Sequence, residues 1–269
     1  MKPFCWILII VLLISACKTV PVTGRKQLNL VPNAMLQAMA FSEYDSVVKV
    51  SATLPQYDER AAMVSRVGAR IQKAVEAYMQ QNNLGKEIKN FKWEYNTINE
   101  NTANAWCMPG GKVVVYTGLL PITQSEEGLA IVMGHEIAHA IARHGNERMS
   151  QGLIINMGGL ALQEALKEKK AETQLLFLGL YMIGSNLAYA LPNSRMQESE
   201  ADKLGLIFAA MAGYDPAAAI PFWQRMSALT QKNSPEFLST HPSNEKRIEN
   251  LMAIIDDIKM KYFKPETNW

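Results

Sequence analysis

The chain has 269 residues, of which 48% are hydrophobic, and its 27 basic and 25 acidic side chains leave a formal charge of +2. A balance so close to neutral, without a basic stripe or a known nucleic-acid motif, argues against nucleic-acid binding. The length is sufficient to bury a large hydrophobic core without support from disulfides.

The first 16 residues have the pattern of a secretory signal. A basic second residue precedes an apolar run from Phe4 to Ile14, which is shorter than the roughly 20 residues needed to span a bilayer. The run leads into "ISAC", which resembles a bacterial lipobox whose cysteine becomes the acylated first residue of the mature protein. We expect a lipoprotein signal peptide at 1–16 and lipidation at Cys17, with a short uncleaved anchor as the alternative. Lysine after the cysteine favours the periplasmic face of the outer membrane in Gram-negative bacteria.

The cysteine count agrees with this interpretation. The sequence has three cysteines; Cys5 would leave with the signal and Cys17 would carry lipid, so only Cys107 remains as a thiol. No intramolecular disulfide is therefore expected in the mature protein. Residues 17–32 are polar and rich in turn residues, which predicts a tether between the lipid and the folded domain.

The next segments alternate between helical and strand patterns. Helices are predicted from about Pro32 to Val50 and from about Asp58 to Gln81. An alternating strand, "FKWEYNTI", follows. Two short β-prone runs, "ANAWCM" and "KVVVYT", are then separated by "PGG", which is a hairpin signal.

The stretch "AIVMGHEIAHAIARHG" contains three of the four histidines of the chain. Because a helix turns about 100° per residue, His135 and His139 lie on one face and aim their imidazoles at the same point. This arrangement is typical of a zinc clamp, and Glu136 lies beside it, where a carboxylate can act as base toward water. A buried helix that matches a short motif by chance is the alternative.

The residues around this motif predict a helix independently. Thr123 and Glu126 match a capping box, and Gly145 stands where a helix stop is expected. The face that contains Leu129 and Val132 is apolar, as a core-packed helix requires. The histidines therefore lie in the middle of a helix that is anchored at both ends.

A catalytic zinc site needs a third protein ligand, and "ESEAD" downstream offers one. This segment predicts a second helix, with Ser194 as N-cap and Gly213 as stop. Glu198 and Asp202 are four residues apart and share a face, whereas Glu200 points elsewhere. We expect Glu198 to bind the metal and Asp202 to orient a metal-bound imidazole. An acidic, solvated helix face is the alternative reading of such a string.

Four motifs in order carry a family resemblance: "NAWCMPGGKVVVYTGLL", "HEIAH", "ESEAD" and "STHPSNEKRI". From about residue 94 to 250 the chain resembles the gluzincin metallopeptidases, a family that includes the CAAX prenyl endopeptidase, HtpX, the Oma-type protease and BepA. The resemblance implies one Zn²⁺ per chain, bound by His135, His139 and Glu198, with Glu136 as general base. These are the same four residues that the spacing indicates.

The hairpin before the motif helix is the candidate substrate-binding element. In zinc peptidases of this build, a strand edge beside the motif helix pairs with an extended substrate backbone. The candidate edge consists of Asn104, Ala105, Trp106, Cys107 and Met108, although either strand of the hairpin could serve. An ordinary structural hairpin is the alternative.

The last histidine and a nearby arginine belong to "STHPSNEKRI". The resemblance implies that the loop with His241 lies near the metal, where in BepA-like members the histidine can occlude the site; a plain turn histidine is the alternative. Arg247 is expected to bind an oxyanion or the substrate backbone, or else to form a structural ion pair. His144 is expected to cap the helix or form an ion pair.

Between the two metal motifs lies a long apolar region, from Gly152 to Leu191, divided by "KEKK". Gln163 and Glu164 interrupt its first half, and Ser185 and Asn186 its second. We expect amphipathic helices that pack over the catalytic cleft, with membrane contact as the alternative.

The expected fold is α+β and mainly helical: one zincin-type metallopeptidase domain over residues 33–265, with a small β-sheet or hairpin beside the HExxH helix. The expected function is that of a zinc-dependent endopeptidase of the bacterial cell envelope, lipid-anchored, which hydrolyses unfolded or misassembled proteins in protein quality control. The rival is a non-catalytic, chaperone-like lipoprotein on the same scaffold, but the base and the three ligands are all present.

Overall fold

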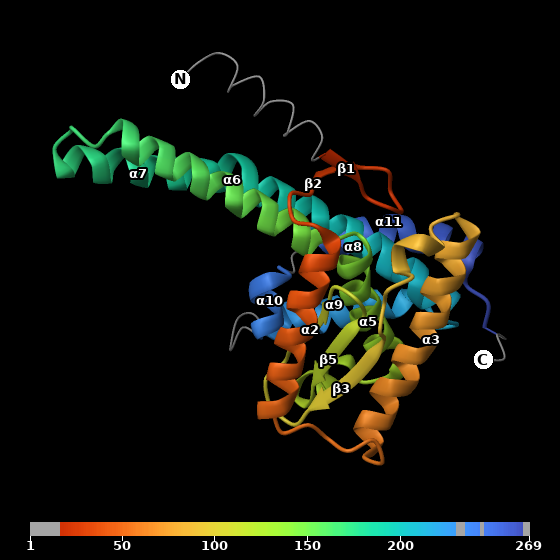
Figure 1. Ribbon diagram of the computed structural model, residues 1–269. Coiled ribbons are helices and arrows are strands. Elements are labelled where there is room, and N and C mark those ends of the chain that lie inside the picture. Colours follow the sequence, from red (N-terminus) through yellow and green to blue (C-terminus); the bar gives the residue numbers. More distant parts are fainter. Residues whose placement is uncertain (1–16, 230–234, 243–244, 266–269) are drawn as a thin grey trace.

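The structure is a computed structural model that describes residues 17–229, 235–242 and 245–265 (Figure 1). Its main helices are α2 (Asn33–Val50), α3 (Glu59–Gln81), α4 (Leu120–Thr123), α5 (Glu126–Ile141), α6 (His144–Ala165), α7 (Ala171–Ser185), α8 (Leu191–Met211), α9 (Ala219–Leu229), α10 (Glu236–Thr240) and α11 (Glu245–Tyr262). The strands are β1 (Cys17–Thr19), β2 (Lys26–Leu28), β3 (Glu94–Ile98), β4 (Ala105–Met108) and β5 (Lys112–Tyr116). The expected mainly helical α+β fold is confirmed.

The small sheet has the strand order β3-β5-β4. β5 lies at the centre, parallel to β3 and antiparallel to β4, and its three valines, Val113–Val115, are fully buried. The turn between β4 and β5 contains Gly110 and Gly111, both with positive φ, a conformation that glycine adopts without strain. The predicted hairpin is thus present, and β4 lies at one edge of the sheet.

The centre of the molecule is the crossing of α5 and α8 (Figure 1). α5 is buried continuously from Gly128 to Ile141. The two helices touch where a glycine of one meets a glycine of the other: a Cβ on Gly134 would lie 2.7 Å from the Gly205 carbonyl oxygen, and one on Gly205 would lie 2.7 Å from the His135 nitrogen. This close approach brings the backbone of α8 against the HExxH motif.

Three predicted helix boundaries differ from the structure. Ser125, rather than Thr123, is the N-cap of α5, and its hydroxyl accepts a hydrogen bond from the Gly128 N–H. α5 ends before Arg143, whose left-handed conformation separates it from α6, and not at Gly145, which lies inside α6. Ser194 is not an N-cap, because α8 continues directly from α7 through a short π-helical segment (Asn186–Ala190).

The segment after Cys17 is not a free tether where the structure describes it. β1 and β2 form a short antiparallel hairpin. The Leu30 N–H donates to the Ser150 hydroxyl at 2.9 Å, and the Asn146 side chain donates to the Val31 carbonyl at 2.7 Å. These hydrogen bonds hold the segment against α6, a contact that composition could not indicate.

The expectation that the apolar region packs over the catalytic cleft is wrong. α6 and α7 leave the body side by side as an arm (Figure 1), and no residue of α7 is buried. Hydrophobic periodicity identified these segments as apolar helices. It could not identify what surrounds them, because their apolar side chains face away from the body.

Candidate metal centre

Four buried side chains from three separate parts of the chain converge beside the α5–α8 crossing. His135 and His139 lie on α5, Glu198 lies on α8, and His241 follows α10. Their potential ligand atoms all lie within 4.8 Å of one another. The structure therefore brings together the three ligands expected from the motifs and adds the histidine of the "HP" loop.

The spacing of these atoms fits a tetrahedral zinc ion. The Nε2 atoms of His135 and His139 are 3.1 Å apart, and each lies 3.2–3.3 Å from a Glu198 carboxylate oxygen. His241 Nδ1 lies 3.1 Å from His135 Nε2 and 3.0 Å from Glu198. Ligands bound to zinc at about 2.0–2.1 Å in a tetrahedron are separated by roughly 3.3 Å. The donor set and its geometry therefore suit zinc.

The charge states of the cluster also suit a cation. Burial opposes ionisation of Glu198, but hydrogen bonds with the imidazoles hold its pKa well below the usual range. Burial lowers the pKa of His139, which favours the neutral imidazole that metal binding requires. Burial opposes protonation of His135, but hydrogen bonds with Asp202 and Glu198 raise its pKa to about 9, so this imidazole releases a proton when a metal binds. A carboxylate together with imidazoles is the type of site that zinc peptidases use.

Asp202 and Arg247 fix the orientation of His135. Asp202 Oδ1 lies 3.0 Å from His135 Nδ1, so it accepts the proton opposite the nitrogen that faces the cluster. Arg247 in turn donates two hydrogen bonds to the Asp202 carboxylate, at 2.7 and 2.9 Å, and lies over the ring of Trp223 at 3.5 Å. Of the two alternatives for Arg247, the ion pair is the one that the structure contains.

A second chain of contacts supports His139. His139 Nδ1 lies 2.8 Å from His144 Nδ1, and His144 Nε2 lies 2.9 Å from Glu200. Because His139 Nε2 faces the cluster, the hydrogen-bond pattern assigns the His139 proton to Nδ1 and the His144 proton to Nε2. Burial lowers the pKa of His144, consistent with this neutral state. His144 does contact a carboxylate, but its neutral ring donates a hydrogen bond to Glu200 rather than forming the expected ion pair, and its other ring nitrogen contacts His139.

Glu200 faces away from the cluster, as expected, and is held by the N-terminal segment. Arg25 donates to Glu200 at 3.0 Å and makes two hydrogen bonds of 2.8 Å to Glu147 on α6. Burial opposes ionisation of Glu200, but the hydrogen bonds from His144 and Arg25 lower its pKa to about 2. A residue eight positions after Cys17 therefore belongs to the network behind His139.

Glu136 has the environment of a proton acceptor. It is 4% exposed, and its Oε1 atom has no hydrogen-bond partner among the described residues; the nearest charged group that contacts it is His241, whose Nε2 lies 3.4 Å away. Burial raises the pKa of this carboxyl, and the neighbouring His241 partly opposes the shift. An unsatisfied buried carboxylate oxygen is costly unless a bound molecule satisfies it, so the position fits a base that awaits water or substrate.

The predicted substrate strand lies at the edge of the sheet. Within the described residues no further strand pairs with the outer side of β4. Burial and the nearby Glu136 carboxylate raise the pKa of Cys107, which indicates that β4 runs close to the base. The start of this edge is occupied by α10: the Phe237 N–H donates to the Ala103 carbonyl at 3.2 Å, and Asn104 donates to Glu236 at 3.1 Å.

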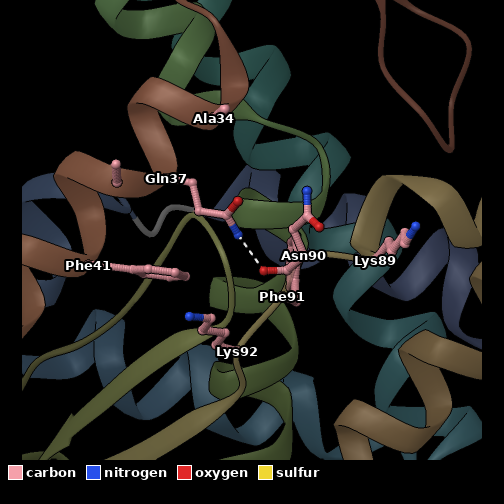
Figure 2. Close-up of a pocket in the computed structure, with 8 residues that line it drawn as sticks. Ala34, Gln37, Phe41, Lys89, Asn90, Phe91 and Lys92 are labelled. Atoms are coloured by element: carbon pink, nitrogen blue, oxygen red, sulfur yellow. Dashed lines mark hydrogen bonds between the residues drawn. The ribbon is translucent and has the colours of Figure 1, made fainter.

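A surface hollow elsewhere does not share residues with this centre. It lies between α2 and the segment 89–92, where Gln37 donates to the Asn90 carbonyl at 2.8 Å (Figure 2). Its charged side chains, Lys89 and Lys92, are both basic. It offers no carboxylate or imidazole for metal chemistry, so the buried cluster is the functional candidate.

A helix with HExxH, an acidic ligand on a second helix and a small sheet beside them define a zinc metallopeptidase of the gluzincin type. Comparison with known families agrees: the sequence profile of Peptidase family M48 matches residues 65–255. The chain belongs to this peptidase family.

Relatives of this chain include mitochondrial and bacterial enzymes. It is 33% identical to the mitochondrial metalloendopeptidase OMA1 of Schizosaccharomyces pombe over 246 residues, which are 90% of this chain and 67% of the relative. It is 28% identical to human OMA1 over 257 residues, 93% of this chain and 48% of the relative. A putative beta-barrel assembly-enhancing protease of Vibrio cholerae is 33% identical over 156 residues, 56% of this chain and 32% of the relative. The chain thus spans from about a third to two thirds of these relatives, and it groups with metalloendopeptidases.

Sequence reasoning missed two contributors to the centre. Arg25 lies in a segment that composition indicated to be a tether, and no local pattern connects it with Glu200. Trp223, which contacts Arg247 and lies 6.2 Å from the His135 ring, belongs to none of the motifs. Both act through contacts between segments that are distant in sequence.

Proposed function

We propose that this protein is a zinc-dependent endopeptidase of the bacterial cell envelope that hydrolyses unfolded or misassembled proteins in quality control. The observation that carries the catalytic part is Glu136, a buried carboxylate with an unsatisfied oxygen beside four convergent metal ligands. The family and the metalloendopeptidase relatives support the reaction class. The "ISAC" sequence at Cys17 and the likeness to a bacterial beta-barrel assembly-enhancing protease support the envelope location.

The residues of this chain divide the reaction among them. When bound, zinc supplies Lewis acidity that polarises a carbonyl and makes water easier to deprotonate. Glu136 accepts the proton of the attacking water and then delivers it to the leaving amine. Asp202 and His144 hold the two α5 imidazoles by their Nδ1 atoms, so the nitrogens that face the metal stay in place. No covalent intermediate is needed.

Substrate binding is assigned to the outer edge of β4. An extended chain that pairs with this edge would be held by main-chain hydrogen bonds, which demand little of its side chains. An unfolded or misassembled protein offers such extended segments, whereas a folded one does not. The free edge beside the base therefore favours unfolded polypeptides as substrates.

The rival function is a binding or chaperone-like role without substrate turnover. A single substitution distinguishes a peptidase from such a binding protein. Glu136→Gln should retain about one zinc per chain and lose cleavage of casein, because its carboxylate transfers protons and does not bind the metal. Glu127→Gln is the matched control, since Glu127 is an exposed residue in the first turn of the same helix. A wild-type protein that binds zinc and casein but cleaves nothing would support the rival.

The position of His241 supports a self-inhibited resting state. Its Nδ1 lies at hydrogen-bond distance from His135 and Glu198, so when zinc is bound it could serve as a fourth protein ligand in place of water. The same loop is connected to the substrate edge through the Phe237 and Glu236 contacts of α10. A substrate that pairs with β4 would compete with these contacts and favour withdrawal of His241.

This self-inhibition can be tested at matched zinc occupancy with an unstructured peptide. His241→Ala should raise kcat, because the position for water becomes free. Glu236→Ala removes the hydrogen bond to Asn104 without touching the imidazole and should raise kcat in the same direction. A lower kcat for His241→Ala would instead assign His241 to transition-state stabilisation, and an unchanged kcat would make it a loop residue.

The lipid anchor is tested separately from catalysis. Cys17→Ser should abolish metabolic labelling of the mature protein with fatty acid, while zinc content and peptide hydrolysis in detergent should stay unchanged. Labelling that persists in Cys17→Ser would contradict the assignment of the lipobox.

A further inference from the structure

The arm formed by α6 and α7 exposes an unusual amount of apolar surface. The helices lie side by side and project from the body (Figure 1), joined by a 3.0 Å hydrogen bond from the Tyr181 hydroxyl to the Ile155 carbonyl. Six large apolar side chains on the arm are each 57–73% exposed: Met157, Leu160, Leu175, Leu176, Leu180 and Ile183. A contiguous apolar surface of this size marks a site that contacts a membrane or another protein.

The charges of the arm are confined to its two ends. At the root, Arg148 and Arg195 are exposed. At the tip, six charged residues lie between positions 164 and 172. Between them, 15 residues of the outgoing helix (149–163) and 22 residues of the returning helix (173–194) carry no charge. At 1.5 Å per residue these stretches are about 22 and 33 Å long. The longer one matches the roughly 30 Å hydrocarbon core of a bilayer, whereas the shorter one, which includes the buried Ser150 and Gln151, falls short of it.

The distribution of apolar side chains around α7 favours lipid over a protein partner. Leu175, Leu176 and Phe177 follow one another at about 100° intervals, yet they are 73, 60 and 49% exposed. A partner helix or a second copy of this chain would cover one stripe and leave the others in water, whereas acyl chains surround a helix. The continuous helix Ala171–Met211 contains an 18-residue window with a mean hydropathy of 1.5, none of which is buried.

The root of the arm is joined to the segment that begins at Cys17. Arg25 pairs with Glu147 in the first turn of α6, and Leu30 donates to Ser150 about one turn further along. An acyl chain on Cys17 that enters the membrane would therefore turn toward the membrane the side of the molecule from which the arm projects. The exposed Arg148 and Arg195 then lie at headgroup level, where basic side chains flank membrane-inserted helices.

We propose that the α6–α7 arm inserts into the bilayer as a helical hairpin, with its charged tip in the opposite headgroup region. Insertion to half depth would instead place the six tip charges near the bilayer centre, where a charged side chain is least stable. The shorter uncharged stretch of α6 is accommodated by long lysine side chains at the tip and by local thinning of the bilayer. Glu198 lies three residues after Arg195 on the same helix, so the metal centre works close to the membrane surface.

Vesicle binding by the full chain with Cys17→Ser tests this without the lipid and without any readout of proteolysis. On vesicles of phosphatidylethanolamine and phosphatidylglycerol, this protein should float with the lipid. Adding both Leu176→Glu and Leu180→Glu should lower the bound fraction at least about tenfold. Met260→Glu is the matched control, because Met260 is a 78% exposed apolar residue on α11, away from the arm, and its variant should bind unchanged.

Depth and side are measured on the same protein. Tryptophan at position 177 (Phe177→Trp) should be quenched by lipids brominated on their acyl chains. Cysteine at position 169 (Lys169→Cys) should react with an impermeant maleimide only after the vesicles are permeabilised. Binding that is insensitive to the glutamates, or a tip labelled from outside, would overturn the proposal. Dimers in sedimentation that dissociate with the Leu176 and Leu180 substitutions, without vesicle binding, would instead identify a second copy as the occupant.

Discussion

The contacts behind His139 predict that two residues that do not bind the metal, His144 and Glu200, contribute to the zinc affinity. His139 donates its Nδ1 proton to His144 at 2.8 Å, and His144 donates to Glu200 at 2.9 Å. His144→Ala removes this support, so the His139 ring is no longer fixed and its Nδ1–H is left without a partner. Loss of such an outer partner typically costs about 10–100-fold in metal affinity, which is about 1.4–2.8 kcal/mol.

Two changes at Glu200 separate geometry from charge. Glu200→Ala removes the terminal acceptor and should lower zinc affinity by about tenfold. Glu200→Gln keeps an oxygen that can accept from His144 but removes the charge that pairs with Arg25, so its effect should be smaller. The sequence alone, which indicated only that Glu200 points away from the ligands, predicts no change for either.

The assay is zinc competition with a chelator of known affinity, accompanied by circular dichroism to show that each variant is folded. Ser199→Ala is the control, because Ser199 is exposed on α8 beside Glu200 and its hydroxyl donates to the Arg195 carbonyl of its own helix. A folded His144→Ala protein with a zinc Kd within about threefold of wild type would refute the role of this network.

Further changes test the ligands, the helix crossing and the acid response. Glu198→Ala should lower zinc affinity far more than any Glu200 variant, measured in the same competition, because it removes a ligand. Gly205→Ala should lower the free energy of unfolding in urea by about 1–3 kcal/mol through overpacking, whereas Gly145→Ala, with open space around its Cβ position, should not destabilise. Because the pKa of Glu200 is about 2 in the folded protein and 4.5 for an unperturbed glutamate, its stabilisation is complete above pH 4.5 and disappears as pH falls toward 2. Denaturant titrations at several pH values should show that the free energy of unfolding falls by about 1–2 kcal/mol less in Glu200→Gln than in wild type over that range, after allowance for solvent screening.

The local part of the site could be predicted because helix geometry is short-ranged. The separation of His135 from His139, and that of Glu198 from Asp202, each correspond to about one turn, so a helical pattern is enough to place each pair on one face. The hairpin was equally local, since "PGG" between two β-prone runs determines a tight turn. These features needed no knowledge of the rest of the fold.

The remainder depends on packing between distant segments. Nothing near Arg25 in the sequence indicates that it meets Glu147 and Glu200, since those partners come from helices more than 100 positions away. The direction of the arm was also invisible, because an apolar helix buried in a core and one surrounded by lipid show the same composition. The N-cap at Ser125 was misplaced for a smaller reason: Thr123 and Ser125 are both good caps, and only the backbone shows which one begins the helix.

One helix connects the two halves of the proposed function. The backbone runs without interruption from Ala171 in the arm to Met211 in the core, and it carries Glu198 and Asp202 shortly after the exposed Arg195. Its other fixed point is the glycine contact with α5, which leaves no room for α8 to slide relative to His135. A bilayer that fixed the position of the arm would therefore also fix the position of Glu198 on the same helix. The distance of Glu198 from the α5 imidazoles is set by the glycine contact between the two helices. If the arm inserts as proposed, the base, the ligands and the substrate edge would keep a fixed orientation toward the membrane, and extended chains would reach β4 from the space beside it.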